Sequence, residues 1–253
     1  MMPPLPAAFL ETPLAHRALH DVADGRPENS RAAIRAAIAA GYGIEIDLQI
    51  SADKRALVFH NYDLDRLAEG QEPVRALAAH EAADVVLKGG DGEGIPDLAE
   101  VLEIVAGQVP LLIEIKDQDG QMGPDVGPLE AAATAALDGY EGPVAVMSFN
   151  PHSVAEMARL APDVPRGLVT SAYDAADWNL PEETRSRLKA ISDFKTCGAA
   201  FISHEAGDLG RARVQELREA GVPVLCWTIR SAEEEGVARV FADNVTFEGY
   251  LPG

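Results

Sequence analysis

Cysteine is scarce in this sequence, and positive charge is outnumbered by negative charge. The two cysteines, Cys197 and Cys226, could form at most one disulfide. Cys226 lies within an apolar, strand-like run, so we expect both thiols to be reduced and structural. The chain has 21 Lys and Arg residues against 41 Asp and Glu residues, a net charge of -20. That charge repels phosphate backbones and anionic lipid surfaces, which argues against a nucleic-acid partner and against stable membrane association.

Long hydrophobic runs are also missing. No stretch approaches the roughly 18 apolar residues of a membrane-spanning helix, and the first residues show neither the basic start nor the apolar run of a secretory signal. We find no internal repeat and no low-complexity segment. We therefore expect a soluble, cytoplasmic protein. With 253 residues, of which 47% are hydrophobic, the chain can build one full core, and a single domain over 1–253 is the default expectation.

Charged residues interrupt two strand-like segments, residues 44–48 (IEIDL) and 113–116 (IEIK). Side chains alternate faces along a strand, so Glu45 and Asp47 share one side, as do Glu114 and Lys116. A carboxylate inside a buried strand is costly unless it is paired or bound to a metal. A salt-bridged edge strand with its polar face in water is one interpretation. The occurrence of both segments favours a site where three carboxylates and an ammonium meet a cation and an anionic substrate.

Strands and helices are predicted to alternate along most of the chain. The predicted strands are residues 14–17, 44–50, 111–116, 144–148, 166–169, 199–203, 223–228 and 244–248. Between them we predict an Ala-rich helix capped by Asn29 or Ser30 and ending near Gly41, helices at 97–106, 129–137, 182–190 and 209–220, one from Pro151, and one before the last strand. Eight parallel strands with intervening helices indicate an α/β fold, the (β/α)₈ TIM barrel, whose active sites lie at the carboxyl ends of the strands.

One segment departs from this alternation. A turn near residue 53 returns the chain as residues 56–60, and antiparallel pairing would place His60 across from residues 45–47, beside the carboxylates. Residues 61–94 are polar and helical only in patches. We interpret them as a small excursion from the barrel rather than as a second core.

Eight short pieces, taken in order, resemble the glycerophosphodiester phosphodiesterases. They are His16-Arg17, Pro27-Glu28-Asn29-Ser30, Glu45-Ile46-Asp47, His60, Ile95-Pro96, Glu114-Ile115-Lys116, Ser148-Phe149 and Trp227-Thr228. The resemblance extends over nearly the whole chain, from His16 to Pro252. It implies a barrel, one divalent cation, and hydrolysis of sn-glycerol-3-phosphodiesters to glycerol 3-phosphate and an alcohol.

Three positions depart from the pattern of that family. Ala18 stands where the family usually has glycine, Asn61 where it usually has aspartate, and Phe247-Glu248 where it usually has Thr-Asp. These departures leave the acidic residues and both histidines in place. They bear on how the substrate fits.

Each candidate residue has a side chain suited to one part of phosphodiester chemistry. Glu45, Asp47 and Glu114 offer the hard oxygen ligands that Mg²⁺ and Ca²⁺ prefer. We expect Arg17 and Lys116 to neutralise the phosphate oxygens, and His16 and His60 to act as an acid and base pair, in an order that the sequence leaves open. Glu28 is expected to orient a histidine or the metal ligands, unless it only favours a helix start. Trp227 is expected either to contact the glycerol or the leaving alcohol, or to pack in the core.

The expected substrate is a small glycerophosphodiester, and its own glycerol hydroxyl is the expected first nucleophile. Ser148 has no base assigned beside it, and neither cysteine is placed as an activated thiolate. The resemblance also implies a cyclic glycerol phosphate that water then opens. Two alternatives remain: a lysophospholipase D-like enzyme of the same fold, and an impaired barrel that only binds phosphodiesters.

Overall fold

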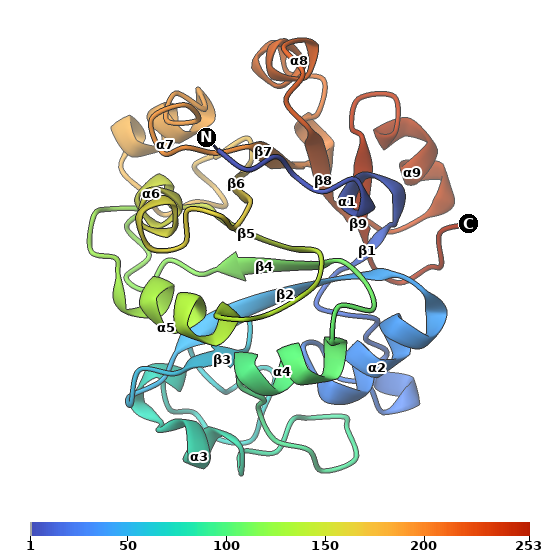
Figure 1. Ribbon diagram of the computed structural model, residues 1–253, viewed down its shortest axis with the longest axis vertical. Coiled ribbons are helices and arrows are strands. Elements are labelled where there is room, and N and C mark those ends of the chain that lie inside the picture. Colours follow the sequence, from blue (N-terminus) through green and yellow to red (C-terminus); the bar gives the residue numbers. More distant parts are fainter. Residues whose placement is uncertain (1) are drawn as a thin grey trace.

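Eight parallel strands close into a barrel in the computed structural model, which describes residues 2–253 (Figure 1). The parallel strands are β1 (Leu14–Ala15), β2 (Gly43–Ile50), β4 (Leu111–Ile115), β5 (Val144–Ser148), β6 (Arg166–Thr170), β7 (Phe201–Glu205), β8 (Val224–Ile229) and β9 (Asn244–Phe247), and an additional strand, β3 (Ala56–Val58), is antiparallel. β1 pairs with β2 on one side and with β9 on the other, which closes the ring, and β3 lies at the edge, where β2 is the one strand within residues 2–253 that it pairs with. The predicted TIM barrel is confirmed.

Helices surround the strands (Figure 1). They are α1 (Ala8–Glu11), α2 (Arg31–Ala40), α3 (Ala79–Ala82), α4 (Leu98–Val105), α5 (Pro128–Leu137), α6 (Pro151–Leu160), α7 (Glu182–Lys189), α8 (Ala212–Glu219) and α9 (Ala232–Ala238), with 3₁₀ turns at Val22–Asp24, Val74–Ala76 and Ala206–Asp208. None of the helices within residues 2–253 has the length and apolar character that crossing a bilayer requires.

α2 shows how local sequence sets the bounds of a helix. Ser30 caps its start, because the Ser30 hydroxyl accepts a hydrogen bond of 3.0 Å from the amide of Ala33. Gly41 ends it in the left-handed conformation, at φ 76°. Ile34 is fully buried and packs with Ile44 and Ile46 in the layer between helices and strands. The helix therefore anchors the outer face of β2, and the charged residues of that strand face the barrel interior.

The barrel interior is apolar at the amino ends of the strands. Leu14, Leu112, Phe201 and Leu225 meet there, and Phe9 packs against them from α1. β6 carries a glycine at residue 167 because a Cβ atom at this position would lie 2.4 Å from the ring of Phe201. At this end the buried Asn244 donates to the carbonyls of Phe9 and Thr12, whereas the charged groups that face inward lie at the carboxyl ends of the strands.

The predicted hairpin is confirmed, and it brings His60 to the carboxylates. Leu48 pairs with Val58 in the antiparallel register, and the amide of Phe59 donates to the carbonyl of Asp47 at 3.0 Å. Beyond His60, the 61–94 segment lies outside the ring, next to β3 (Figure 1). It has a small apolar cluster of its own, in which Leu64, Ala68, Val74, Ala82 and Leu87 pack against Leu57, Phe59 and Ile95.

Two of the predicted barrel strands differ from the structure by two residues, and the others differ by at most one residue at either end. The first was expected over 14–17, but β1 ends at Ala15 because Arg17 and Ala18 adopt left-handed conformations, at φ 52° and 64°, which turn the chain away. The sixth of the predicted strands was expected over 199–203, whereas β7 runs from Phe201 to Glu205. The amide of Ala199 still bonds to Phe194 in the preceding turn, so the strand starts later.

Candidate active site

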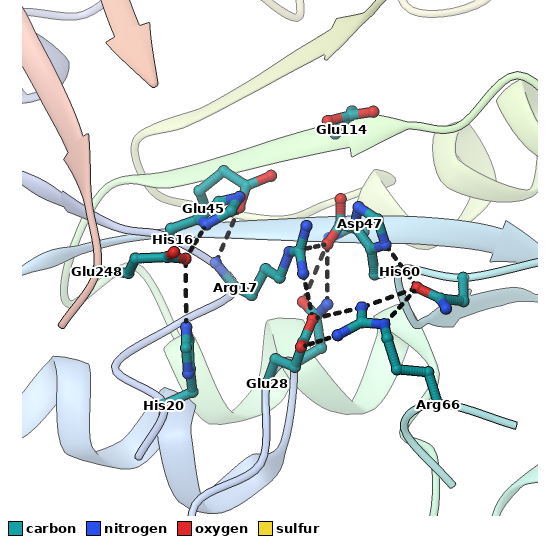
Figure 2. A network of polar contacts seen from close by, with 12 residues as sticks. His16, Arg17, His20, Glu28, Glu45, Asp47, His60, Arg66, Glu114 and Glu248 are labelled. Carbon is teal, nitrogen blue, oxygen red and sulfur yellow. Dashed lines mark hydrogen bonds and ion pairs between the residues drawn. The ribbon is translucent and has the colours of Figure 1, made fainter. Parts of the chain in front are cut away.

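Three buried carboxylates meet inside the barrel, as the sequence predicts. Glu45 and Asp47 lie on β2 and Glu114 lies on β4, and the parallel register pairs Asp47 with Glu114. These residues are 1%, 1% and 7% exposed, respectively. One oxygen of each lies within 4.8 Å of the others, a spacing at which a single metal ion could be held. Figure 2 shows the three carboxylates along the neighbouring strands.

Asp47 is the best compensated of the three. Lys116 Nζ lies 2.8 Å from Asp47 Oδ1 and 2.8 Å from Glu114 Oε1. Asn29 Nδ2 donates to Asp47 Oδ2 at 2.9 Å, and Arg17 Nε lies 3.6 Å from the same oxygen. Burial by itself would raise the pKa of Asp47, but the charge of Lys116 above all outweighs it and lowers this pKa. Asp47 is therefore held as a carboxylate.

Glu45 lacks such compensation. The one hydrogen bond that its side chain receives from the described residues comes from the backbone amide of Arg17, at 2.9 Å. Burial, together with the charges of Asp47 and Glu114, raises the pKa of Glu45 well above its usual value. The site thus carries more buried negative charge than Lys116 and Arg17 balance. A divalent cation would relieve this excess, and an all-oxygen donor set suits Mg²⁺ or Ca²⁺, so the residues present fit such an ion.

The two candidate histidines line the same cavity. His16 follows β1 directly, and its Nδ1 lies 2.6 Å from Glu248 Oε2. His60 follows β3, and its Nδ1 lies 2.8 Å from Asn61 Oδ1. Within residues 2–253, neither Nε2 atom has a hydrogen-bond partner. Burial lowers the pKa of His16 and, together with the charges of Lys116 and Arg17, lowers the pKa of His60 to about 4. Each ring is oriented through Nδ1 and has its other nitrogen available to a ligand.

Glu28 connects Arg17 to the 61–94 segment. Glu28 Oε2 accepts from Arg17 Nη1 at 2.5 Å, and Glu28 Oε1 accepts from Arg66 Nη1 at 2.5 Å (Figure 2). Arg66 Nη2 also donates to Asn61 Oδ1 at 2.8 Å, the oxygen that orients His60. Glu28 therefore touches the arginine rather than a histidine or a carboxylate, and it fixes the guanidinium of Arg17 over the site.

Ala18 occupies a conformation that favours glycine. Its φ of 64° lies in the left-handed region, which costs a residue with a Cβ atom about 1 kcal/mol or more. Arg17 and Asn29 also have positive φ values, of 52° and 60°. This backbone directs the amide of Arg17 at Glu45 and the side chain of Asn29 at Asp47. The glycine expected at position 18 thus has a conformational reason, and Ala18 retains the same backbone path.

Most of the predicted site residues line one cavity of about 190 Å³. It is bordered by His16, Arg17, Glu45, His60, Glu114, Lys116 and Trp227, among others. Asp47 and Glu28 lie just behind this surface, where they contact Lys116 and Arg17. Trp227 donates through Nε1 to the carbonyl of Ser203 at 3.0 Å, which leaves its ring against the cavity. A second cavity of about 470 Å³ adjoins the first.

Glu248 and Arg66 complete the site, and the sequence analysis assigned a role to neither. Glu248 follows β9 and binds His16, and its Oε1 accepts from Arg230 Nε at 2.8 Å. The hydrogen bond from His16, more than any other contact, lowers the pKa of Glu248. A signal for Glu248 was present, because an acid at the carboxyl end of the last strand lies beside the end of the first strand in a closed barrel. Arg66 lies in an irregular segment and gave no such signal.

Comparisons with known proteins agree with this arrangement. A model of the glycerophosphoryl diester phosphodiesterase family matches residues 16–246. The chain is 31% identical over 229 residues, 87% of each sequence, to a glycerophosphodiester phosphodiesterase from Caldanaerobacter subterraneus subsp. tengcongensis. A phosphodiesterase from Oleispira antarctica, solved in complex with the product sn-glycerol-3-phosphate, superposes with a TM-score of 0.75 at 23% identity, covering 95% of this chain and 94% of that one. A glycerophosphodiester phosphodiesterase from Parabacteroides distasonis superposes with a TM-score of 0.74 at 20% identity, covering 93% of this chain and 92% of that one. The two solved structures show the shared fold.

Proposed function

The chain belongs to the glycerophosphoryl diester phosphodiesterase family, and we propose that it hydrolyses small glycerophosphodiesters to sn-glycerol 3-phosphate and an alcohol with one divalent cation bound. One observation carries the proposal: two cations, two imidazoles with available Nε2 atoms and the carboxylates of Glu45 and Glu114 line a single cavity, with Asp47 directly behind its wall. A protein that only bound phosphodiesters would need no pair of proton-transfer groups. The geometry therefore favours catalysis over binding alone.

Glu45, Asp47 and Glu114 would hold the cation, and Arg17 and Lys116 would bind the phosphate. When bound, Mg²⁺ or Ca²⁺ supplies Lewis-acid stabilisation of charge on the phosphate oxygens. Lys116 has three N–H donors, of which Asp47 and Glu114 accept two, so one is left for the substrate. Glu28 and Arg66 hold the Arg17 guanidinium in place before the substrate arrives, which limits the ordering cost of binding.

The two histidines would move the protons. In the first step one imidazole takes the proton of the glycerol 2-hydroxyl as that oxygen bonds to phosphorus, and the other donates a proton to the departing alcohol oxygen. In the second step the roles reverse: water gives its proton to the second imidazole, and the first returns a proton to the 2-hydroxyl as the cyclic phosphate opens. The protons balance over the cycle. Glu248 and Asn61 orient the rings through Nδ1.

The surrounding residues offer no activated nucleophile of their own. The Ser148 hydroxyl donates to the carbonyl of Ile115 at 2.7 Å, and no base contacts it. Burial raises the pKa of Cys197 to about 11 and that of Cys226 to about 12, so neither is a thiolate at neutral pH. Thr246, on the cavity wall, has no hydrogen bond to a base among the residues described. This supports attack by the substrate's own hydroxyl.

Turnover of glycerophosphocholine with and without a chelator tests the proposed function. We expect release of glycerol 3-phosphate that stops with EDTA and returns with excess Mg²⁺ or Ca²⁺, because the buried carboxylates need a cation. A coupled glycerol-3-phosphate assay measures it. Full activity in the chelated protein would contradict the metal requirement, and inactivity towards glycerophosphodiesters under all conditions would contradict the hydrolytic function.

Replacing either histidine tests the proton transfers. We expect His16→Ala and His60→Ala each to lower kcat by roughly 10²- to 10⁴-fold, the usual contribution of a positioned acid or base. A substrate with a p-nitrophenol leaving group needs no acid, because its leaving oxygen departs without a proton. We therefore expect this substrate to restore kcat in the variant that lacks the acid, whereas kcat of the variant that lacks the base stays low. Near wild-type kcat in one of the variants would remove that histidine from the mechanism.

Glu248 is expected to act through His16 as a positioning residue. Glu248→Gln keeps the shape but removes the charge beside Nδ1, so we expect kcat to fall about 10-fold or more while KM changes little. Glu248→Asp should recover part of the loss, because a carboxylate returns to the same ring. The nearby surface substitution Glu233→Gln is the control. A raised KM with unchanged kcat, or an equal loss of kcat in Glu248→Gln and Glu248→Asp, would argue for a structural role.

A substrate that lacks the glycerol 2-hydroxyl tests the route. We expect the 2-deoxy analogue of glycerophosphocholine to compete for the site with similar affinity but to turn over far more slowly, since its nucleophile is missing. Competition assays and single-turnover rates measure the two properties. Equal kcat for the two substrates would mean that water attacks the phosphodiester directly.

A further inference from the structure

A second, larger cavity extends from the catalytic cavity. Its volume is about 470 Å³, against about 190 Å³ for the cavity that holds His16 and Arg17. The two share His60, Glu114, Lys116, Phe149 and Trp227 in their walls. A phosphodiester bound at Lys116 therefore has room for one small arm in the barrel and one larger arm beyond His60.

Aromatic rings form one wall of the larger cavity. The ring centroid of Phe149 lies 5.5 Å from that of Trp227, and the two ring planes make an angle of 85°. Its centroid lies 4.9 Å from that of Trp178, with an interplanar angle of 54°. The buried Tyr173 packs behind them, and its ring centroid lies 4.8 Å from that of Trp178. The three front rings are only half-buried, so they present ring surface to a ligand. Such a wall attracts apolar groups and, through the ring quadrupoles, cations.

Negative charge dominates the rest of this cavity. Asp63, Asp65 and Asp117 line it together with Glu114, and the one cationic side chain in its wall is Lys116. Lys116 is already engaged by Asp47 and Glu114. Asp117 is buried, with 6% exposed, and it accepts hydrogen bonds from Asn150 Nδ2 at 2.7 Å and from the amide of Met122 at 3.0 Å. An anionic group would therefore be repelled here.

Building on the proposed function, we propose that the larger cavity binds the leaving alcohol and selects one that carries a quaternary ammonium group. The smaller cavity suits the glycerol phosphate, because its wall holds both imidazoles and the phosphate-binding cations. The larger one then receives the other ester arm. A trimethylammonium group presents methyl groups and a positive charge together, which matches a lining that combines aromatic rings with the carboxylate of Asp63.

This arrangement also ranks the other classes of alcohol. A polyol could donate hydrogen bonds to the carboxylates of this cavity, but it would lose hydrogen bonds to water where it meets the rings of Phe149, Trp178 and Trp227. An alcohol bearing a carboxylate or phosphate would meet the carboxylates of Asp63 and Asp65. A neutral apolar alcohol would contact the rings but gain nothing from the charge.

The test compares glycerophosphocholine with its neutral isostere, the glycerophosphodiester of 3,3-dimethylbutan-1-ol. The two have the same shape and differ in charge, so their ratio of kcat/KM isolates the effect of the positive charge. We expect the choline diester to be preferred by roughly tenfold, the scale of a cation–π contact supported by a nearby carboxylate. Trp178→Leu and Asp63→Asn should each bring the ratio closer to one, through a higher KM for the choline diester. Asp177→Asn, next to Trp178 but outside both cavities, should leave the ratio unchanged.

Each outcome decides between the claims. Equal kcat/KM for the two diesters, or a preference that both variants retain, would overturn the inference while the proposed function stands. Faster hydrolysis of lysophosphatidylcholine than of glycerophosphocholine would mean that the aromatic wall receives an acyl chain, and this too would overturn it. No hydrolysis of any diester would instead contradict the proposed function. Circular dichroism of both variants guards against loss of folding, and Asp63 is exposed, so its substitution leaves the core untouched.

Discussion

The excess of buried negative charge on β2 and β4 is the constraint on which the rest of the site depends. Glu45, Asp47 and Glu114 lie almost fully inside the barrel, where an uncompensated carboxylate costs several kcal/mol. Lys116 offsets part of that cost through its contacts with Asp47 and Glu114. Among the residues described, Glu45 is left with a single donor, the backbone amide of Arg17. This excess of negative charge favours the binding of a divalent cation to the three carboxylates.

The barrel turns this local constraint into a catalytic site. Residues from β1, β2, β4, β8 and β9 reach one cavity because parallel strands all end on the same side. At the amino ends of the strands the interior is filled with apolar side chains, so the charged groups lie at the carboxyl ends. The 61–94 segment adds Arg66, which holds Glu28 against Arg17, and Asp63, which borders the larger cavity. The barrel thus places the residues that line the cavity, and the added segment supplies residues around them.

Sequence periodicity predicted the parts of this molecule that follow from local rules. Alternation along residues 44–48 and 113–116 put the carboxylates on one face, and the hairpin register put His60 beside them; both are seen in the structure. The contact between His16 and Glu248 joins residues 232 positions apart, and no local pattern reports such a pairing. The contact of Arg66 with Glu28 was not predicted, because the hydrophobic residues of its segment follow neither a helical nor a strand period. The early end of β1 depends on left-handed residues that the sequence signals only weakly, since Arg17 and Ala18 are not glycines.

Calorimetric titration of a divalent cation into chelator-treated protein tests the central claim most directly, because it measures binding without any substrate. The account predicts one site per chain for Mg²⁺ or Ca²⁺, with affinity weakened strongly in Glu45→Gln and Glu114→Gln and unchanged in the surface variant Glu219→Gln. Equal affinity in all of these proteins, or no binding to the wild-type chain, would contradict it.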